Sequence, residues 1–252
     1  MVLTNTGTTF LAYANSLLDL AAKAASVVKD AEEQPAGTVT FMLPASIGGM
    51  VSAELFSTAS KLYPGIELRL IEFSTDLSEH IFSSNLCDFV VTFDNRNQEN
   101  LNSKPLVKEK LYLVTRYDPK ARHSQLEFSA LGKYPIMSPH KHRGILPILT
   151  SLAEKRKAKL QISANTAPYS IILRLAEMGA TNVVSPYPVV DELVKSQRVS
   201  AFEIVKPEVF REVNLVWPKD KPVSNAAEKI MALTSSIIIK QHNAVNFVKA
   251  AG

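Results

Sequence analysis

The sequence predicts an α/β fold in which two Rossmann-like βα subdomains follow a long N-terminal helix. Residues 38–73 alternate as a strand, continue with apolar side chains at helical spacing and then alternate again. Such a strand–helix–strand crossover implies a parallel sheet. The pattern restarts after Tyr117-Asp118-Pro119, and apolar residues between positions 5 and 33 repeat at spacings of four and three. The expected units are a helix at 1–34, a first subdomain at 36–117 and 212–252, and a second subdomain at 118–211.

The first crossover organises the chain. Residues 38–43 place alternate apolar side chains on one face, Pro64-Gly65 ends the helix, and residues 66–73 form the second strand. Ser46 lies at the expected start of the helix, where its hydroxyl can cap free backbone N–H groups. This loop lies at the carboxyl end of the sheet, where open α/β folds bind ligands, and a helix N-terminus there suits an anion. Ser46 is therefore either a ligand contact or only the cap of a packing helix.

The heptad pattern predicts a long N-terminal helix with one apolar seam. A break that contains Pro35 and Gly37 follows it. The helix either packs on its own domain or pairs with a second chain, and the break favours pairing. The expected dimerisation residues are Phe10, Ala14, Leu17, Ala21, Ala24 and Val28.

Apolar runs and turn residues predict the remaining elements. A short helix capped by Ser74-Thr75, a strand at 87–93, a polar loop at 94–103 and a strand around 106 and 110–115 complete the first unit. The chain returns through a strand at 212–217 to a final helix at 226–247, which Asn225 and Glu228 begin with capping-box spacing. In the second unit we expect strands at 134–137, 160–162, 182–184 and 201–205, and helices at 148–157, 165–179 and 189–196.

Composition narrows the function classes. The 252 residues are 46% hydrophobic and 21% charged, as in ordinary soluble globular proteins. A net charge of +4 is mildly basic and does not establish a nucleic-acid partner, which usually requires a concentrated basic face. No run of ~20 apolar residues predicts a membrane span, and the first residues lack the features of a signal peptide. Together with a single cysteine, Cys87, which we expect in the core, this indicates a cytoplasmic protein without a membrane partner.

Catalytic and metal-binding motifs are absent from the sequence. It contains no G-x-S-x-G, P-loop or G-x-G-x-x-G pattern, and no motif identifies a base partner for Ser46. His140 and His142 stand two residues apart without a further ligand nearby, which is poor support for a metal site. We therefore expect no cofactor, no metal and no enzyme activity.

Several segments together resemble the LysR-type transcriptional regulators, a bacterial family. Leu3-Thr4-Asn5-Thr6-Gly7 resembles the family's L-T-x-x-G, Tyr63-Pro64-Gly65-Ile66-Glu67-Leu68 resembles Y-P-x-V-x-L, and Ala176-Glu177-Met178-Gly179 resembles V-A-x-G. Asn85-Leu86-Cys87-Asp88-Phe89 resembles the G-x-L-D-x segment, from which Asn85 and Cys87 depart. These motifs keep the family's order over nearly the whole chain. Residues 106–114 and the strand into Trp217-Pro218 look closest to nitrogen-assimilation-control-type members.

The resemblance implies a fold like that of type 2 periplasmic binding proteins, with an effector site between the two subdomains. Hydroxyls and backbone N–H groups at helix N-termini suit a carboxylate or another anion. By position in the family's pattern, the implied effector-binding residues are Ala45, Ser46, Ile47, Thr75, Ser138, Pro139, His140, Asn165, Thr166 and Ala167.

The family also implies a winged helix-turn-helix upstream of Leu3, which the sequence as given lacks. We expect a fragment with an added Met1 rather than a natural truncated inhibitor, and DNA contact only through the missing domain. The resemblance further implies a homodimer or homotetramer built from paired linker helices.

The expected function is the effector-sensing and oligomerisation portion of a LysR-type regulator, which binds a small anionic metabolite between its subdomains. A solute-binding protein of a transport system remains an alternative, although the signal peptide it needs is not seen. An enzyme on the same fold, and an assembly module whose cleft is filled by its own side chains, are further alternatives.

Overall fold

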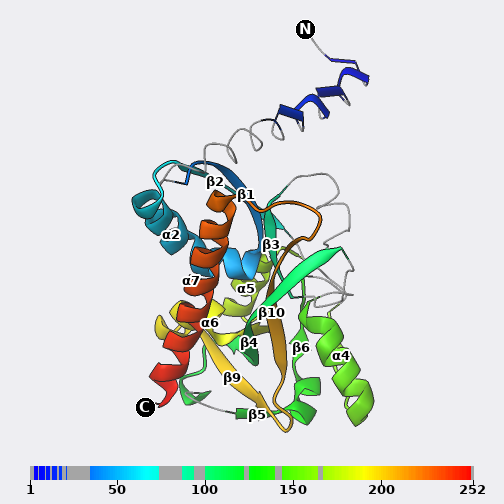
Figure 1. Cartoon of the computed structure of the whole chain (residues 1–252). Coiled ribbons are helices and arrows are strands. Elements are labelled where there is room, and N and C mark those ends of the chain that lie inside the picture. The colour runs from blue at the N-terminus through cyan, green and yellow to red at the C-terminus, as the bar shows by residue number, and fades with distance from the viewer. Residues whose placement is uncertain are drawn as a thin grey trace.

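The computed structural model describes residues 3–4, 6–8, 10–11, 13–15, 17–18, 21, 35–73, 87–93, 100–121, 125–139, 144–163 and 167–250, with side chains to 244. These residues form a mixed eight-stranded sheet, a two-stranded sheet and flanking helices (Figure 1). The large sheet has the order β2-β1-β3-β10-β4-β9-β5, and β8 pairs with β4. The predicted α/β class is confirmed.

The described strands range from two residues in β6 and β7 to 16 residues in β4. They are β1 (Gly37–Pro44), β2 (Ile66–Phe73), β3 (Phe89–Thr92), β4 (Leu101–Arg116), β5 (Gln125–Glu127), β6 (Pro135–Ile136), β7 (Gln161–Ile162), β8 (Val183–Pro186), β9 (Val199–Val205) and β10 (Phe210–Pro218). The helices are α2 (Ala45–Leu62), α4 (Ile145–Arg156), α5 (Tyr169–Glu177), α6 (Tyr187–Lys195) and α7 (Asn225–Ala250), with 3-10 turns η1 (Pro119–Ala121) and η2 (Phe128–Lys133).

The first crossover forms as predicted. β1 pairs in parallel with β2 along its whole length and with β3 at Phe41 and Met42. The carboxyl ends of these three strands therefore lie at one edge of the sheet, where α2 begins. The short helix expected after Ser74-Thr75 lies outside the described residues.

Strands β4 and β10 cross from one half of the molecule to the other. β4 pairs antiparallel with β10 from Leu101 to Lys110, and then with β8 and β9 from Leu111 to Arg116. Figure 1 shows these two long strands running side by side through the centre. The polar loop predicted at 94–103 is wrong at its end, because 101–103 belong to β4 and pair with β10.

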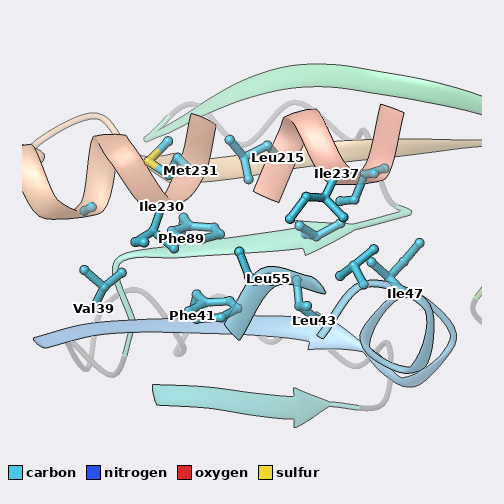
Figure 2. Packing of buried hydrophobic residues seen from close by; sticks show 14 of the residues in the cluster. Val39, Phe41, Leu43, Ile47, Leu55, Phe89, Leu215, Ile230, Met231 and Ile237 are labelled. Carbon is cyan, nitrogen blue, oxygen red and sulfur yellow. The ribbon is translucent and has the colours of Figure 1, made fainter. Parts of the chain in front are cut away.

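Separate hydrophobic cores lie on either side of this crossing. The first contains Phe41 and Phe89, whose rings stack with centroids 5.2 Å apart, together with residues of α2 and α7 such as Leu55 and Ile230. Figure 2 shows both rings, with Ile230 nearby. Two further clusters are built from residues between 111 and 209. Among the residues that the structure describes, each half therefore has a core of its own.

Two predicted helix caps are wrong. α2 begins at Ala45 with Pro44 as its extended N-cap residue, so Ser46 lies inside the first turn and caps nothing. Proline suits this place because its fixed φ and missing N–H cost nothing before a helix. At the start of α7, the Ser224 hydroxyl accepts a 3.1 Å hydrogen bond from the Ala227 N–H. Ser224 is therefore the cap, one residue before the predicted Asn225.

The described N-terminal residues from Thr6 onward are helical, and Figure 1 shows this segment reaching away from the rest of the molecule. Phe10 and Leu17 are 71% and 67% exposed, and Ala14 and Ala21 lie in the same segment. Ala24 and Val28 lie outside the described residues. Among the described helices, none is long and apolar enough to cross a membrane.

Candidate functional site

A cavity of about 420 Å³ opens at the carboxyl ends of β1, β2 and β3. One wall consists of Pro44, the start of α2, the end of β2 and Arg211 of β10. The opposite wall consists of the segment after β6, the N-terminal ends of α4 and α5, and β8. The cavity therefore lies between the two halves whose cores are separate. Its size is within the ~300–1,000 Å³ that small-molecule sites occupy.

The structure brings five of the predicted effector-binding residues to this cavity. Ala45, Ser46, Ser138, Pro139 and Ala167 all line it, although they come from three distant parts of the chain.

Ile47 is placed differently from the other predicted residues of its loop. Its side chain is fully buried in the first core and does not line the cavity. The helical turn explains this, because successive residues of a helix point in different directions. Thr75, His140, Asn165 and Thr166 lie outside the described residues.

Arg211 is the buried cation of the cavity wall. It is 5% exposed, its Nη2 donates to the Ser46 hydroxyl at 3.3 Å, and its Nε donates to Glu109. Its Cζ also lies 3.6 Å from the ring centroid of Phe93, which is a close cation–π contact. The guanidinium is thus held in one orientation by residues from three separate parts of the chain, which preorganises it for a ligand.

Glu109 connects Arg211 to helix α7. Its carboxylate accepts from Arg211 and from Nε2 of His242, at 2.5 Å in the second case. Burial alone would raise the pKa of Glu109, but the Arg211 charge and the His242 hydrogen bond hold that pKa below its usual value. Glu109 is therefore ionised at neutral pH.

His242 joins the far side of Glu109 to helix α7. Its Nδ1 lies 2.7 Å from the Ile238 carbonyl oxygen, and its Nε2 lies 2.5 Å from a carboxylate oxygen of Glu109. The buried carboxylate of Glu109 therefore has two partners, and of these Arg211 also lines the cavity.

Tyr169 adds a polar group at the start of α5. Its hydroxyl lies 2.5 Å from the buried Ser185 hydroxyl of β8. Burial raises the pKa of Tyr169 to about 12, and the bond to Ser185 opposes this shift. Tyr169 is therefore a neutral hydrogen-bonding group of the cavity wall.

Sequence reasoning missed Arg211, Glu109 and Tyr169. The alternation of buried and exposed positions along a strand could have identified Arg211 and Glu109. Arg211 alternates with the buried Val213 and Leu215, and Glu109 alternates with the buried Leu111 and Leu113. A charged residue on the buried face of a strand needs a partner, so each position indicates a buried ion pair. Tyr169 follows Pro168 at a helix start and carries no comparable signal.

Among the described residues, no group of three His, Cys, Asp or Glu side chains could hold a metal ion. His140 and His142 lie outside these residues. Cys87 is buried in a small cluster with Met42 and Phe73, as expected of a core residue.

Comparisons with known proteins agree with this architecture. The structure of a cysteine-to-serine mutant of Corynebacterium glutamicum OxyR with bound H2O2 matches with a TM-score of 0.74 at 17% identity, covering 98% of this chain and 80% of that one. The effector-binding domain of QuiR in complex with shikimate matches with a TM-score of 0.69 at 16% identity, covering 82% of this chain and 99% of that one. At these identities the matches establish the fold.

Sequence comparison identifies the family. A relative from Escherichia coli K12, the uncharacterized HTH-type transcriptional regulator YbhD, is 25% identical over 196 residues. The match covers 77% of this chain but only 59% of the relative. The family model of the LysR substrate binding domain matches residues 32–235. The chain therefore belongs to the LysR substrate binding domain family.

Proposed function

We propose that this chain is the effector-sensing part of a LysR-type transcriptional regulator, and that a small anionic metabolite binds in the cavity between its two halves. The observation that carries this proposal is the buried Arg211 on the cavity wall, whose guanidinium contacts Glu109, Ser46 and Phe93. Its remaining N–H donors would form charge-assisted hydrogen bonds with an anion. Contacts from the opposite wall would come from Ser138, Pro139 and Ala167.

The two halves would act as subdomains that change their relative angle. The proposed division is 36–117 with 212–252 for the first and 118–211 for the second. The separate cores support it, as does the change of strand partners of β4 after Lys110. A ligand that touches both walls binds better when they are close, and this differential affinity would shift the equilibrium between two arrangements.

The whole protein would read DNA through a winged helix-turn-helix that precedes this domain. YbhD is named as an HTH-type regulator, and the match spans only part of its length. The exposed apolar residues of the N-terminal helix would pair with a second copy, giving a dimer or a tetramer of dimers. The effector would then re-aim the DNA-binding domains through the linker helices, without catalysis.

Thermal stability in the presence of candidate ligands tests the sensing proposal. The panel contains amino acids, dicarboxylates, aromatic acids and inorganic anions. A ligand at ~100 times its dissociation constant adds ~2.7 kcal/mol to the free energy of unfolding. We expect a selective rise in the melting temperature that Ser46→Ala weakens. Ser57→Ala is the matched control, because Ser57 is an exposed residue of the same helix and does not line the cavity.

The panel can also contradict the proposal. Equal stabilisation of wild type and Ser46→Ala by every anion would indicate a non-specific salt effect. A folded protein with no shift across the whole panel would show that the cavity is not a site for small anions.

A further inference from the structure

We propose that the cavity takes an amphipathic organic monocarboxylate, with its carboxylate on Arg211 and Ser46 and an aromatic or branched aliphatic body against Met137, Leu146 and Val183. This inference rests on the proposed function, since it names the ligand class of the same site. It excludes inorganic anions and short dicarboxylates as the principal ligands.

The position of the ligand's carboxylate follows from the N–H donors of Arg211 that Glu109 and Ser46 do not use. A guanidinium has five N–H donors, and here Glu109 and Ser46 take two of them. Among the described residues, the remaining donors have no hydrogen-bond partner. The Phe93 ring and the two hydrogen bonds fix the plane of the guanidinium. A carboxylate can therefore approach the remaining edge of the guanidinium without the Arg211 side chain having to move.

The remaining donors of Arg211 favour an anion over a neutral polar group. Arg211 and Glu109 are both buried, and within the described part of the chain Arg211 pairs with no second carboxylate. A bound carboxylate forms charge-assisted hydrogen bonds with the guanidinium, which are about twice as strong as those of a neutral isostere of the same shape.

The apolar end follows from the opposite wall. Ile136, Leu146, Leu149 and Val183 are all buried and line the cavity with no charged side chain among them. A second carboxylate directed at these four side chains would lose its hydration without gaining a cationic partner among the described residues of this wall, which is costly. The acidic side chain that does line the cavity, Glu72, would repel a second negative charge as well. A ligand with one charge and an apolar body satisfies both walls.

Isothermal titration calorimetry of the full chain with matched probes tests this inference. Benzoate and phenylacetate have one charge and an aromatic body. Benzamide has the same ring without the charge, terephthalate has a second charge at the far end of the ring, and succinate and inorganic phosphate have no apolar body. We expect binding of a monocarboxylate probe at least about tenfold tighter than of benzamide, terephthalate, succinate or phosphate.

Two variants address the two ends of the ligand separately. Arg211→Lys keeps the positive charge beside Glu109, so we expect the protein to fold. The substitution removes the planar guanidinium, and we expect it to weaken binding of the monocarboxylate probe at least about tenfold relative to wild type. Ile145→Trp fills the apolar side of the cavity and should abolish binding of ring-containing probes. Arg174→Lys is the control, because Arg174 is 66% exposed and does not line the cavity. Circular dichroism confirms that each variant is folded.

The outcomes separate this inference from the broader proposal. Tight binding of succinate or phosphate that Arg211→Lys weakens would overturn the monocarboxylate class while supporting a small-anion site. Equal binding of benzoate and benzamide, or unchanged binding in Arg211→Lys, would overturn the role of Arg211. Failure of every anion to bind the folded wild-type chain would overturn both proposals.

Discussion

Glu109 and Arg211 are register partners on the two crossing strands β4 and β10, and their side chains form a buried ion pair. The pair lies next to the point where β4 stops pairing with β10 and begins to pair with β8 and β9. The same guanidinium lines the cavity, and the same carboxylate contacts His242 of α7. One ion pair therefore connects the cavity, the crossing strands and the last helix.

Breaking this pair is expected to destabilise the fold. Glu109→Gln leaves Arg211 buried without its counter-charge, and breaking a buried ion pair by removing one partner costs about 3–5 kcal/mol. Urea unfolding followed by circular dichroism measures the change. Glu127→Gln is the control, because its ion pair with Lys206 is exposed on both sides and should contribute nothing measurable. Equal stability of wild type and Glu109→Gln would show that the buried pair carries no net stabilisation.

The pH dependence of stability should report the same carboxylate. The pKa of Glu109 is lower in the folded protein than in the unfolded chain, where it is about 4.3. The ionised form therefore stabilises the fold above pH ~4.3, and this contribution is lost as the pH falls through the lower folded pKa. Unfolding free energies measured from pH 7 to pH 3 should fall less steeply for Glu109→Gln than for wild type. Parallel curves would contradict the prediction.

Adjacent residues of α2 should differ sharply in their tolerance of substitution. Leu55 is fully buried in the first core, whereas Phe56 is 40% exposed. Leu55→Ala should lower the free energy of unfolding by about 2–5 kcal/mol because it leaves a cavity. Phe56→Ala should change it by only about 0.5 kcal/mol, although it removes the larger side chain. Similar losses for both variants would mean that Phe56 is covered in solution, as at an interface.

A glycine-to-alanine substitution should have opposite effects on stability at Gly132 and at Gly49. A Cβ at Gly132 would lie 2.5 Å from the Lys159 carbonyl oxygen, so the backbone must move, and Gly132→Ala should cost about 1–3 kcal/mol. A Cβ at Gly49 would meet nothing within 4 Å. Because Gly49 lies inside α2, Gly49→Ala should stabilise by about 0.5–1 kcal/mol. Thermal unfolding of both variants beside wild type checks the signs, and a stabilising Gly132→Ala would contradict the close approach.

The sequence predicts the first crossover well because its signals are local. Alternation, helical spacing and Pro64-Gly65 lie within residues 38–73, and β1, α2 and β2 form there. The first part of β4 is not predicted, because Asn102, Ser103, Lys104 and Pro105 lack the pattern of a strand. Those residues are strand only because β10, more than a hundred residues away, pairs with them.

The candidate site is predictable in part for the same reason. Ser46, Ser138 and Ala167 follow strands or precede helices, so motif position locates them, and the structure places all three on one cavity. Arg211 reaches that cavity because it faces inward on a strand that pairs with a distant one. Its pairing with Glu109, which in turn contacts His242, depends on tertiary structure that no single stretch of sequence encodes. The alternation of buried and exposed positions along the strand predicts that Arg211 is a buried charge but does not identify its partner.

The exposed seam of the N-terminal helix should control the oligomeric state. Phe10 and Leu17 lie seven residues apart, on the same side of a helix, and both are largely exposed in one chain. Replacing both with serine should lower the molar mass measured by sedimentation equilibrium, because the paired helices lose their apolar contact. Asn15→Ser is the control, since Asn15 is an exposed polar residue outside the seam. A double variant that keeps the wild-type mass, or a monomeric wild type, would mean that these side chains do not join two chains.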